Sequence, residues 1–311
     1  MDSYKIPAAA FLKGGGNGTL PGGILMQNTI YPIGLSTCGN KPLDEQSLIE
    51  LKESGIDFIE LSNQIYDDFD FEMIQKTAQR HGISVWSLHL PFAPFDQLDP
   101  SALDTDKRQY TLNFMKALIL RGSAAGIDKF VIHPSIEPID DQIRKAKLDA
   151  SASFLGELAD FADTFGAVIA VENLPRTCLG KNSAEILRLT AANDKLRVCF
   201  DTNHLLGEDI PTFIRNVGRK IITTHVSDYD FVNERHWLPG EGKADWSAVY
   251  NTLQEVGYEG VWLYEVGFAP EKSISRRLLT CKDFVENARS IFRGETPDAI
   301  GKPIENLGFW A

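Results

Sequence analysis

Six short apolar runs in this sequence each carry, at or beside their last position, a side chain that can bind a metal ion or transfer a proton. In chain order these side chains are His89, His133, Glu172, Asp201, His225 and Glu265. A carboxylate that follows a buried apolar run is costly to desolvate unless it is paired or binds a cation. The repetition therefore indicates a metal site where the runs meet, with His204 nearby in the chain after Asp201.

The residue types favour a divalent cation with mostly oxygen ligands. Three carboxylates and one histidine suit Mn²⁺, Mg²⁺, Co²⁺ or Zn²⁺, and each further histidine shifts the preference toward Zn²⁺. We expect one divalent metal ion and no organic cofactor. The expected ligands are Glu172, Asp201, His225 and Glu265.

Eight candidate strands must position these residues. They are YPIGLST, DFIELS, SVWSLHL, KFVIHPS, AVIAVEN, LRVCFDT, IITTHVSD and VWLYEV, and most are rich in β-branched or aromatic residues. Such composition is typical of strands buried on both faces. Amphipathic segments, several of which end at glycine, separate the strands and predict helices. Eight strand–helix units predict a parallel sheet closed into an α/β (β/α)8 TIM barrel. An open doubly wound sheet is the alternative, but GLSTCGNKPLDE lacks its glycine fingerprint.

The barrel is predicted to be a single catalytic domain over residues 30–293. The preceding residues 1–29 contain FLKGGGNGTLPGG, and this glycine-rich segment predicts a flexible N-terminal arm. Residues 294–311 show no helical or strand periodicity and are expected to form a C-terminal tail.

The carboxyl ends of barrel strands meet at one mouth, where barrel active sites are built. Glu172 and Glu265 follow the fifth and eighth candidate strands, so they would approach a bound substrate from different sides. A metal ion between them could polarise a carbonyl and hydroxyl pair and stabilise an enediolate. One glutamate could then remove a proton and the other return one. This chemistry is aldose–ketose isomerisation or epimerisation.

The overall composition indicates which classes of binding partner to expect. The chain has 311 residues, of which 31 are basic and 43 acidic, for a net charge of -12. An acidic protein lacks the general attraction to phosphate backbones, so we expect a small-molecule substrate and no nucleic acid. No apolar run approaches the roughly 18 residues of a membrane span. Four scattered cysteines and a poor signal peptide predict a cytoplasmic location.

From about Tyr31 to Phe292 the chain resembles the xylose isomerase-like barrel superfamily. The resemblance is carried, in order and spacing, by IAVENLP, VCFDTNH, HVSDYD, RHWLPGEGKADW and WLYEV. This superfamily includes sugar isomerases and epimerases as well as endonuclease IV-type enzymes. Its members are often dimers or tetramers, which makes a homo-oligomer a possible state of this chain.

The resemblance implies roles for residues of this chain. The four expected ligands would bind the metal, with Glu172 and Glu265 also serving as the acid/base pair. His204 and Arg235 would lie near substrate hydroxyls or phosphate, and Asp228 would orient His225. Trp237, beside His236, is a candidate for stacking on a sugar ring. The expected substrate contacts are thus His89, His133, His204, Arg235, His236 and Trp237.

The segment NERHWLPGEG leaves a second function open. Endonuclease IV-type enzymes carry an acid-Arg-His triplet there and use three zinc ions. Carried over to this chain, the additional ligands would be His89, His133, His204, Glu234 and His236. Glu234 is one methylene longer than the aspartate of that subfamily, and the loops near the mouth are acidic or neutral. These features favour a sugar or sugar phosphate substrate over DNA. An inosose-type dehydratase or isomerase would use the same site.

Overall fold

The computed structural model describes residues 30–39 and 43–305. The predicted N-terminal arm (residues 1–29) and the end of the predicted tail (residues 306–311) lie outside these residues. The eight main strands are β1 (Ile33–Ser36), β2 (Phe58–Ser62), β3 (Ser84–His89), β4 (Lys129–Ile132), β5 (Val168–Glu172), β6 (Arg197–Asp201), β7 (Ile221–His225) and β8 (Trp262–Tyr264).

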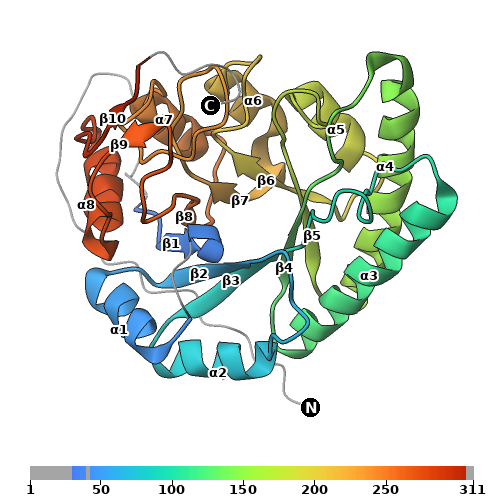
Figure 1. Cartoon of the computed structure of the whole chain (residues 1–311), viewed down its shortest axis with the longest axis horizontal. Helices are drawn as coiled ribbons and strands as arrows, with labels where there is room; N and C mark the ends of the chain where they lie inside the picture. The colour runs from blue at the N-terminus through green and yellow to red at the C-terminus, as the bar shows by residue number, and fades with distance from the viewer. Residues whose placement is uncertain (1–29, 40–42, 306–311) are drawn as a thin grey trace.

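These strands form one parallel sheet that closes on itself, which confirms the predicted barrel. Each strand from β1 to β6 pairs with the next, and β1 also pairs with β8. Between β7 and β8 the connection is a parallel bridge from Val226 to Tyr264. Figure 1 shows the central strands with the helices around them.

The helices alternate with the strands. They are α1 (Glu45–Ser54), α2 (Phe71–Arg80), α3 (Thr105–Ala124), α4 (Asp141–Asp163), α5 (Ser183–Thr190), α6 (Ile210–Val217), α7 (Trp246–Glu255) and α8 (Cys281–Phe292), with short 3-10 turns η1 (Thr37–Gly39) and η2 (Gly218–Lys220). Most begin at an aspartate whose side chain accepts a backbone N–H of the first turn. These caps are Asp44, Asp70, Asp104, Asp140, Asp209 and Asp245. Part of the acidic excess is therefore used in helix capping.

Alternation along the strands separates an outer from an inner face of the barrel. In β6, Val198 and Phe200 belong to the large apolar core, and Phe200 stacks on Phe213 of α6 at 5.3 Å between ring centroids. Cys199 belongs instead to a small second apolar cluster. Because side chains alternate with a period of two, Asp201 lies on the same inner face as Cys199. The barrel interior thus ends in polar side chains.

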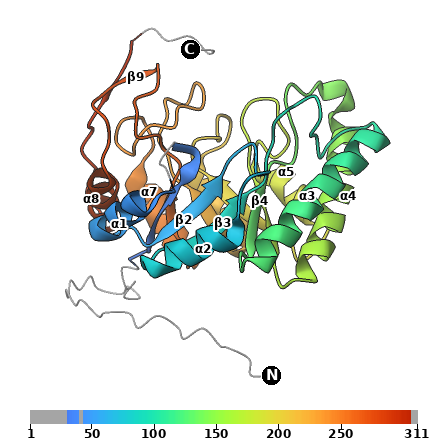
Figure 2. The same cartoon turned by 60° about the horizontal axis from the view of Figure 1, so that its bottom comes forward.

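The connections that follow the strands lie together at one end of the barrel (Figure 2). Among them, β9 (Ile274–Ser275) pairs antiparallel with β10 (Lys302–Pro303). Part of the expected tail is therefore a short strand, which the sequence pattern did not indicate because two residues show no periodicity. Its neighbour Gly301 donates its N–H to Glu241 Oε1 at 2.7 Å, and Glu241 Oε2 accepts from Arg276 Nη1 at 2.6 Å.

Within the described ranges, no helix has the combination of length and apolar character that crossing a bilayer requires.

The loop between β7 and α7 is organised by a buried carboxylate. Asp228 accepts hydrogen bonds from the backbone N–H groups of Gly240 and Ala244, at 2.8 and 3.1 Å, and from Trp246 Nε1 at 2.8 Å. Gly242 lies directly against this carboxylate, and a Cβ there would overlap Asp228 Oδ1 and the carbonyl oxygen of Tyr229. The glycine is required for close approach rather than for an unusual backbone conformation.

We therefore expect Gly242→Ala to lower the free energy of unfolding by about 1–3 kcal/mol, because an added methyl group must displace the buried Asp228 network. Gly207→Ala is the matched control, since a Cβ there meets nothing within 4 Å. Urea unfolding followed by circular dichroism measures both variants. Equal midpoints for the two would contradict the packing explanation.

Candidate active site

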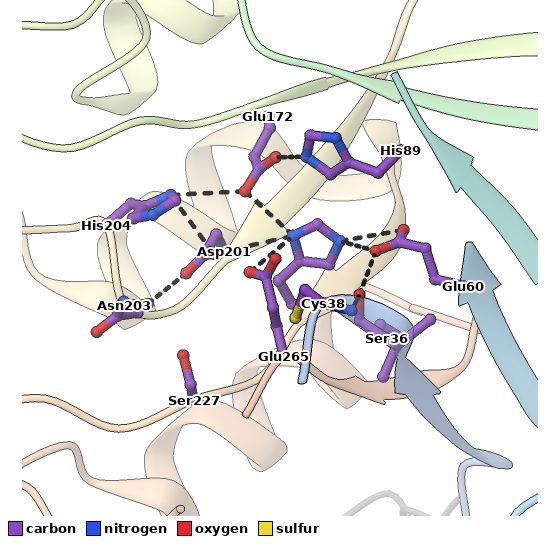
Figure 3. Close-up of polar contacts among 12 residues, drawn as sticks. Ser36, Cys38, Glu60, His89, Glu172, Asp201, Asn203, His204, Ser227 and Glu265 are labelled. Carbon is purple, nitrogen blue, oxygen red and sulfur yellow. Dashed lines mark hydrogen bonds and ion pairs between the residues drawn. The ribbon is translucent and has the colours of Figure 1, made fainter. Parts of the chain in front are cut away.

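The four side chains expected to bind a metal converge at the barrel mouth. Glu172, Asp201 and His225 end β5, β6 and β7, and Glu265 directly follows β8. His225 Nδ1 lies 3.1 Å from Glu172 Oε1, 3.3 Å from Glu265 Oε2 and 3.8 Å from Asp201 Oδ2. One ligand atom from each residue lies within 4.8 Å of the others. Figure 3 shows the side chains of Glu172, Asp201 and Glu265 directed toward one another. We call these four residues the central group.

The central group concentrates negative charge where water is scarce. Asp201 is fully buried, and no hydrogen-bond partner for its Oδ2 occurs in the described part of the chain. Burial raises the pKa of Asp201 to about 8; His204 opposes the rise, and the Glu265 and Glu172 carboxylates add to it. Asp201 Oδ2 lies 3.4 Å from His204 Nδ1 without a hydrogen bond. A buried oxygen in that state, beside two other carboxylates, is in an environment that a bound divalent cation would stabilise. The donor set of three carboxylates and one imidazole therefore fits such an ion.

A carboxylate that the sequence analysis did not identify holds the far side of the histidine. Glu60 of β2 is fully buried, and its Oε1 lies 3.0 Å from His225 Nε2. It also accepts hydrogen bonds from Ser36 Oγ at 3.1 Å and Ser87 Oγ at 2.7 Å. With the Nε2 hydrogen directed at Glu60, His225 presents Nδ1 to the central group, the arrangement usual for metal-binding histidines. The signal was available, because Glu60 interrupts the apolar residues of FIELS.

Asp228 does not take the role that was expected for it. Its carboxylate accepts loop N–H groups and the Trp246 indole, whereas both ring nitrogens of His225 face other carboxylates. The sequence order placed Asp228 close to His225, but the residue lies beyond the end of β7, where the chain has already turned into the loop. Glu60 occupies the position proposed for Asp228.

His89 and His133 contact the second oxygen of Glu172. Their Nε2 atoms lie 3.0 and 3.2 Å from Glu172 Oε2. The ring of Phe92 stacks on His133 with 4.3 Å between centroids and 11° between planes. Burial alone raises the pKa of Glu172, but His225 and His133 outweigh it and hold this pKa well below its usual range. Glu172 is therefore ionised and contacted through both oxygens.

His204, Glu234 and His236 form a further group beside the central group, with ligand atoms within 4.8 Å of one another. His204 Nδ1 faces the carbonyl oxygen of Asn173 at 2.9 Å, and its Nε2 lies 3.3 Å from Glu234 Oε2. Burial alone lowers the pKa of His204, but Asp201 and Glu234 outweigh it and raise the pKa to about 10. We call these three residues the lateral group.

Arg235 and Trp237, which were expected to contact the substrate, are buried within the loop between β7 and α7. Each is 1% exposed. Arg235 Nε donates to Asp230 Oδ2 at 3.0 Å, and Trp237 Nε1 donates to Ser273 Oγ at 2.9 Å. Both side chains hold the loop that carries His236. Their contact with a substrate stays a prediction.

The arrangement can carry out proton transfer. Glu172 and Glu265 reach the central group from β5 and β8, and the Glu265 side chain is the more exposed of the two at 12% against 1%. Burial alone raises the pKa of Glu265, but His225 and His236 outweigh it and lower the pKa. Two ionised carboxylates that reach one point of the barrel mouth from different strands are the elements of a general acid/base pair.

Comparisons with known proteins agree with this geometry. A family model described as xylose isomerase-like TIM barrel matches residues 48–280. An inosose isomerase of Bacillus licheniformis is 31% identical over 145 residues, which are 42% of this chain and 51% of that protein. An inosose dehydratase of Lacticaseibacillus casei is 25% identical over 284 residues, which are 78% of this chain and 90% of that protein. An uncharacterized protein of Methanocaldococcus jannaschii is 28% identical over 178 residues, 54% of this chain and 61% of that protein.

The match thus spans between half and two thirds of the length of the M. jannaschii and B. licheniformis relatives. Among solved structures, an L-ribulose 3-epimerase superposes with a TM-score of 0.70 at 21% identity, covering 85% of this chain and 94% of that one. A D-tagatose 3-epimerase-like protein superposes with a TM-score of 0.67 at 22% identity, covering 76% and 90%. These two likenesses support the fold. Because the family model covers most of the sequence, including β2 to β8, the chain belongs to the xylose isomerase-like TIM barrel family.

Proposed function

We propose that this protein is a divalent-metal-dependent isomerase or epimerase of a sugar or sugar phosphate. The observation that carries the proposal is the central group itself. Three carboxylates and an imidazole from four strands converge, and Asp201 Oδ2 is buried without a hydrogen-bond partner in the described residues. The curated relatives named inosose isomerase and the superposing L-ribulose 3-epimerase support a small polyhydroxylated substrate.

Glu172, Asp201, His225 and Glu265 would hold the metal ion. When bound, a divalent cation supplies polarisation of a substrate carbonyl and an adjacent hydroxyl, which makes the neighbouring C–H acidic and favours an enediolate.

Glu172 and Glu265 then perform the proton transfers. Their pKa values lie below the usual range, so each carboxylate is free to accept a proton from carbon. One glutamate in its ionised form removes the proton next to the carbonyl. The other, after taking up a proton from water, returns that proton to the same carbon from its opposite side or to the neighbouring carbon, and the first glutamate then releases its proton to water. Return to the neighbouring carbon also requires the hydroxyl proton to move to the former carbonyl oxygen. Return to the same carbon is epimerisation, and return to the neighbour is isomerisation. His89, His133, His204 and His236 surround these carboxylates and are proposed to bind substrate hydroxyls.

Two other functions use the same residues. Dehydration of an inosose-like polyol begins with the same proton abstraction, and the L. casei relative bears that name. The endonuclease IV-type alternative is favoured by one observation, the presence of two further sets of ligand-capable side chains, His89–His133–Glu172 and His204–Glu234–His236. The net charge of -12 disfavours it, since a DNA substrate needs a basic surface.

Replacing either acid/base glutamate tests the mechanism. Glu172→Gln and Glu265→Gln should each lower turnover by about 10²–10⁴-fold, because the amide cannot accept the proton. A panel of ketoses, aldoses and inososes assayed in D₂O measures both turnover and deuterium incorporation at carbon. Glu259→Gln, at an exposed residue before β8, is the control and should be unaffected. Unchanged turnover in either glutamate variant would rule the mechanism out.

Metal content separates the alternatives. Elemental mass spectrometry of protein purified without chelators should find about one Mn, Co, Mg or Zn per chain, as expected for one site of mixed carboxylate and histidine ligands. Chelation should lower thermal stability, because a ligand present at 100 times its Kd contributes about 2.7 kcal/mol to the folded state. Close to three zinc ions per chain would instead support the endonuclease alternative and call for an assay of abasic-site DNA cleavage.

Glu60→Gln tests how His225 is held. The amide oxygen still accepts the Nε2 hydrogen but carries no charge, so metal affinity should fall about 10–100-fold. Competition with a chromophoric chelator measures the Kd. Glu185→Gln is the control, since Glu185 pairs with Arg144 at 2.7 Å outside the central group and its loss should change stability without changing the Kd. An unaltered Kd in Glu60→Gln would show that Glu60 is only structural.

A further inference from the structure

The lateral group has the composition of a second metal site, since two imidazoles and a carboxylate lie within 4.8 Å of one another. A neighbouring cation from the protein itself already contacts it. Arg176 lies in the loop after β5, and its guanidinium nitrogens Nη1 and Nη2 are each 3.1 Å from Glu234 Oε1. The other Glu234 oxygen, Oε2, lies 3.3 Å from His204 Nε2. Both carboxylate oxygens of Glu234 are therefore engaged.

The guanidinium of Arg176 also donates hydrogen bonds to acceptors in two other loops. Nη1 donates to Asn233 Oδ1 at 2.7 Å, Nε lies 3.0 Å from Glu137 Oε1, and Nη2 also contacts Glu137. Together with the hydrogen bond from Nη2 to Glu234, these bonds use four of the five N–H groups of the side chain, and Nη1 also lies 3.1 Å from Glu234 Oε1 as an ion pair. Only 12% of the Arg176 side chain is exposed. Arginine is thus a fixed cation that joins the loops after β4, β5 and β7.

The backbone of Arg176 supports the same conclusion. Its φ is 53°, in the left-handed region that side chains other than glycine rarely adopt. Such a conformation persists only where surrounding contacts determine it, and it occurs most often at functional sites. The bonds to Glu137, Asn233 and Glu234 are those contacts.

We propose that the guanidinium of Arg176 takes the place of a divalent cation at the lateral group and keeps that group free of metal. For a metal ion to bind Glu234, the carboxylate would have to release Arg176 or His204, and the ion would then lie beside a charge of the same sign. His204 is in turn left as a hydrogen-bonding side chain facing the central group. This inference concerns metal number and does not depend on which substrate the central group converts.

The test is zinc stoichiometry. Wild-type protein, Arg176→Met and Arg176→Met/Glu234→Gln are stripped with a chelator, equilibrated with the same excess of ZnCl₂, desalted and analysed by elemental mass spectrometry. Arg176→Met should bind about one more Zn²⁺ per chain than the wild type, because two histidines and a freed carboxylate form a three-ligand zinc site. The double variant should lose this additional ion. If Arg176→Met does not fold, Arg176→Gly replaces it, since glycine accepts the positive φ without strain.

Glu234→Gln in the otherwise wild-type chain completes the design. The proposal expects this variant to bind as much Zn²⁺ as the wild type. A loss of about one ion per chain would show that Glu234 already binds metal beside an intact Arg176, and would overturn the proposal. The same stoichiometry in wild type and Arg176→Met would overturn it as well. A wild type that binds no metal would refute the proposed metal-dependent function separately, whatever the difference between the variants.

Discussion

The rest of the mouth depends on the cost of burying several carboxylates together. Glu60, Glu172 and Asp201 are almost completely buried and lie on the inner face of the barrel, where little water can solvate them. Like charges at this spacing disfavour ionisation unless cations or hydrogen-bond donors compensate. The five histidines of the mouth supply part of that compensation, and Asp201 Oδ2 is the place where it is incomplete. The barrel therefore holds a site arranged for an additional positive charge.

His225 lies between Glu60 on one side and the carboxylates of the central group on the other. One ring nitrogen faces Glu172 and Glu265 and the other faces Glu60, so the ring couples the position of β2 to the carboxylates at the ends of β5 and β8. Ser36 and Ser87 orient Glu60 from β1 and β3. Side chains from most strands of the barrel are thus linked through hydrogen bonds to one imidazole. A closed barrel makes this possible, because strands distant in sequence meet across its interior.

The residues that could be predicted from the sequence are those whose positions follow from local patterns. Strand ends could be located from short apolar runs, and parallel pairing brings strand ends together, so Glu172, Asp201, His225 and Glu265 were predicted as one group. Glu60 was missed because its strand was treated as uniformly buried. The alternation in FIELS already placed the Glu60 side chain on the other face of the strand from Ile59 and Leu61. The direction of Asp228 could not be predicted. It depends on Gly240, Ala244 and Trp246 approaching through a loop whose path has no periodic signal.

The distribution of backbone strain also marks the mouth as the functional end. Among the described residues, the three non-glycine residues with positive φ are Arg176, Phe231 and His236, and all lie in the loops after β5 and β7. Each such conformation costs on the order of 1–3 kcal/mol and must be supported by its surroundings. Arg176 forms an ion pair with Glu234, and a ring nitrogen of His236 lies within 4.8 Å of a Glu234 carboxylate oxygen. The backbone is thus strained at His236 of the lateral group and at Arg176 beside it, while none of the four residues of the central group has a positive φ. The strand ends therefore fix the positions of the central group, whereas the loops that carry the lateral group determine which polar side chains lie beside it.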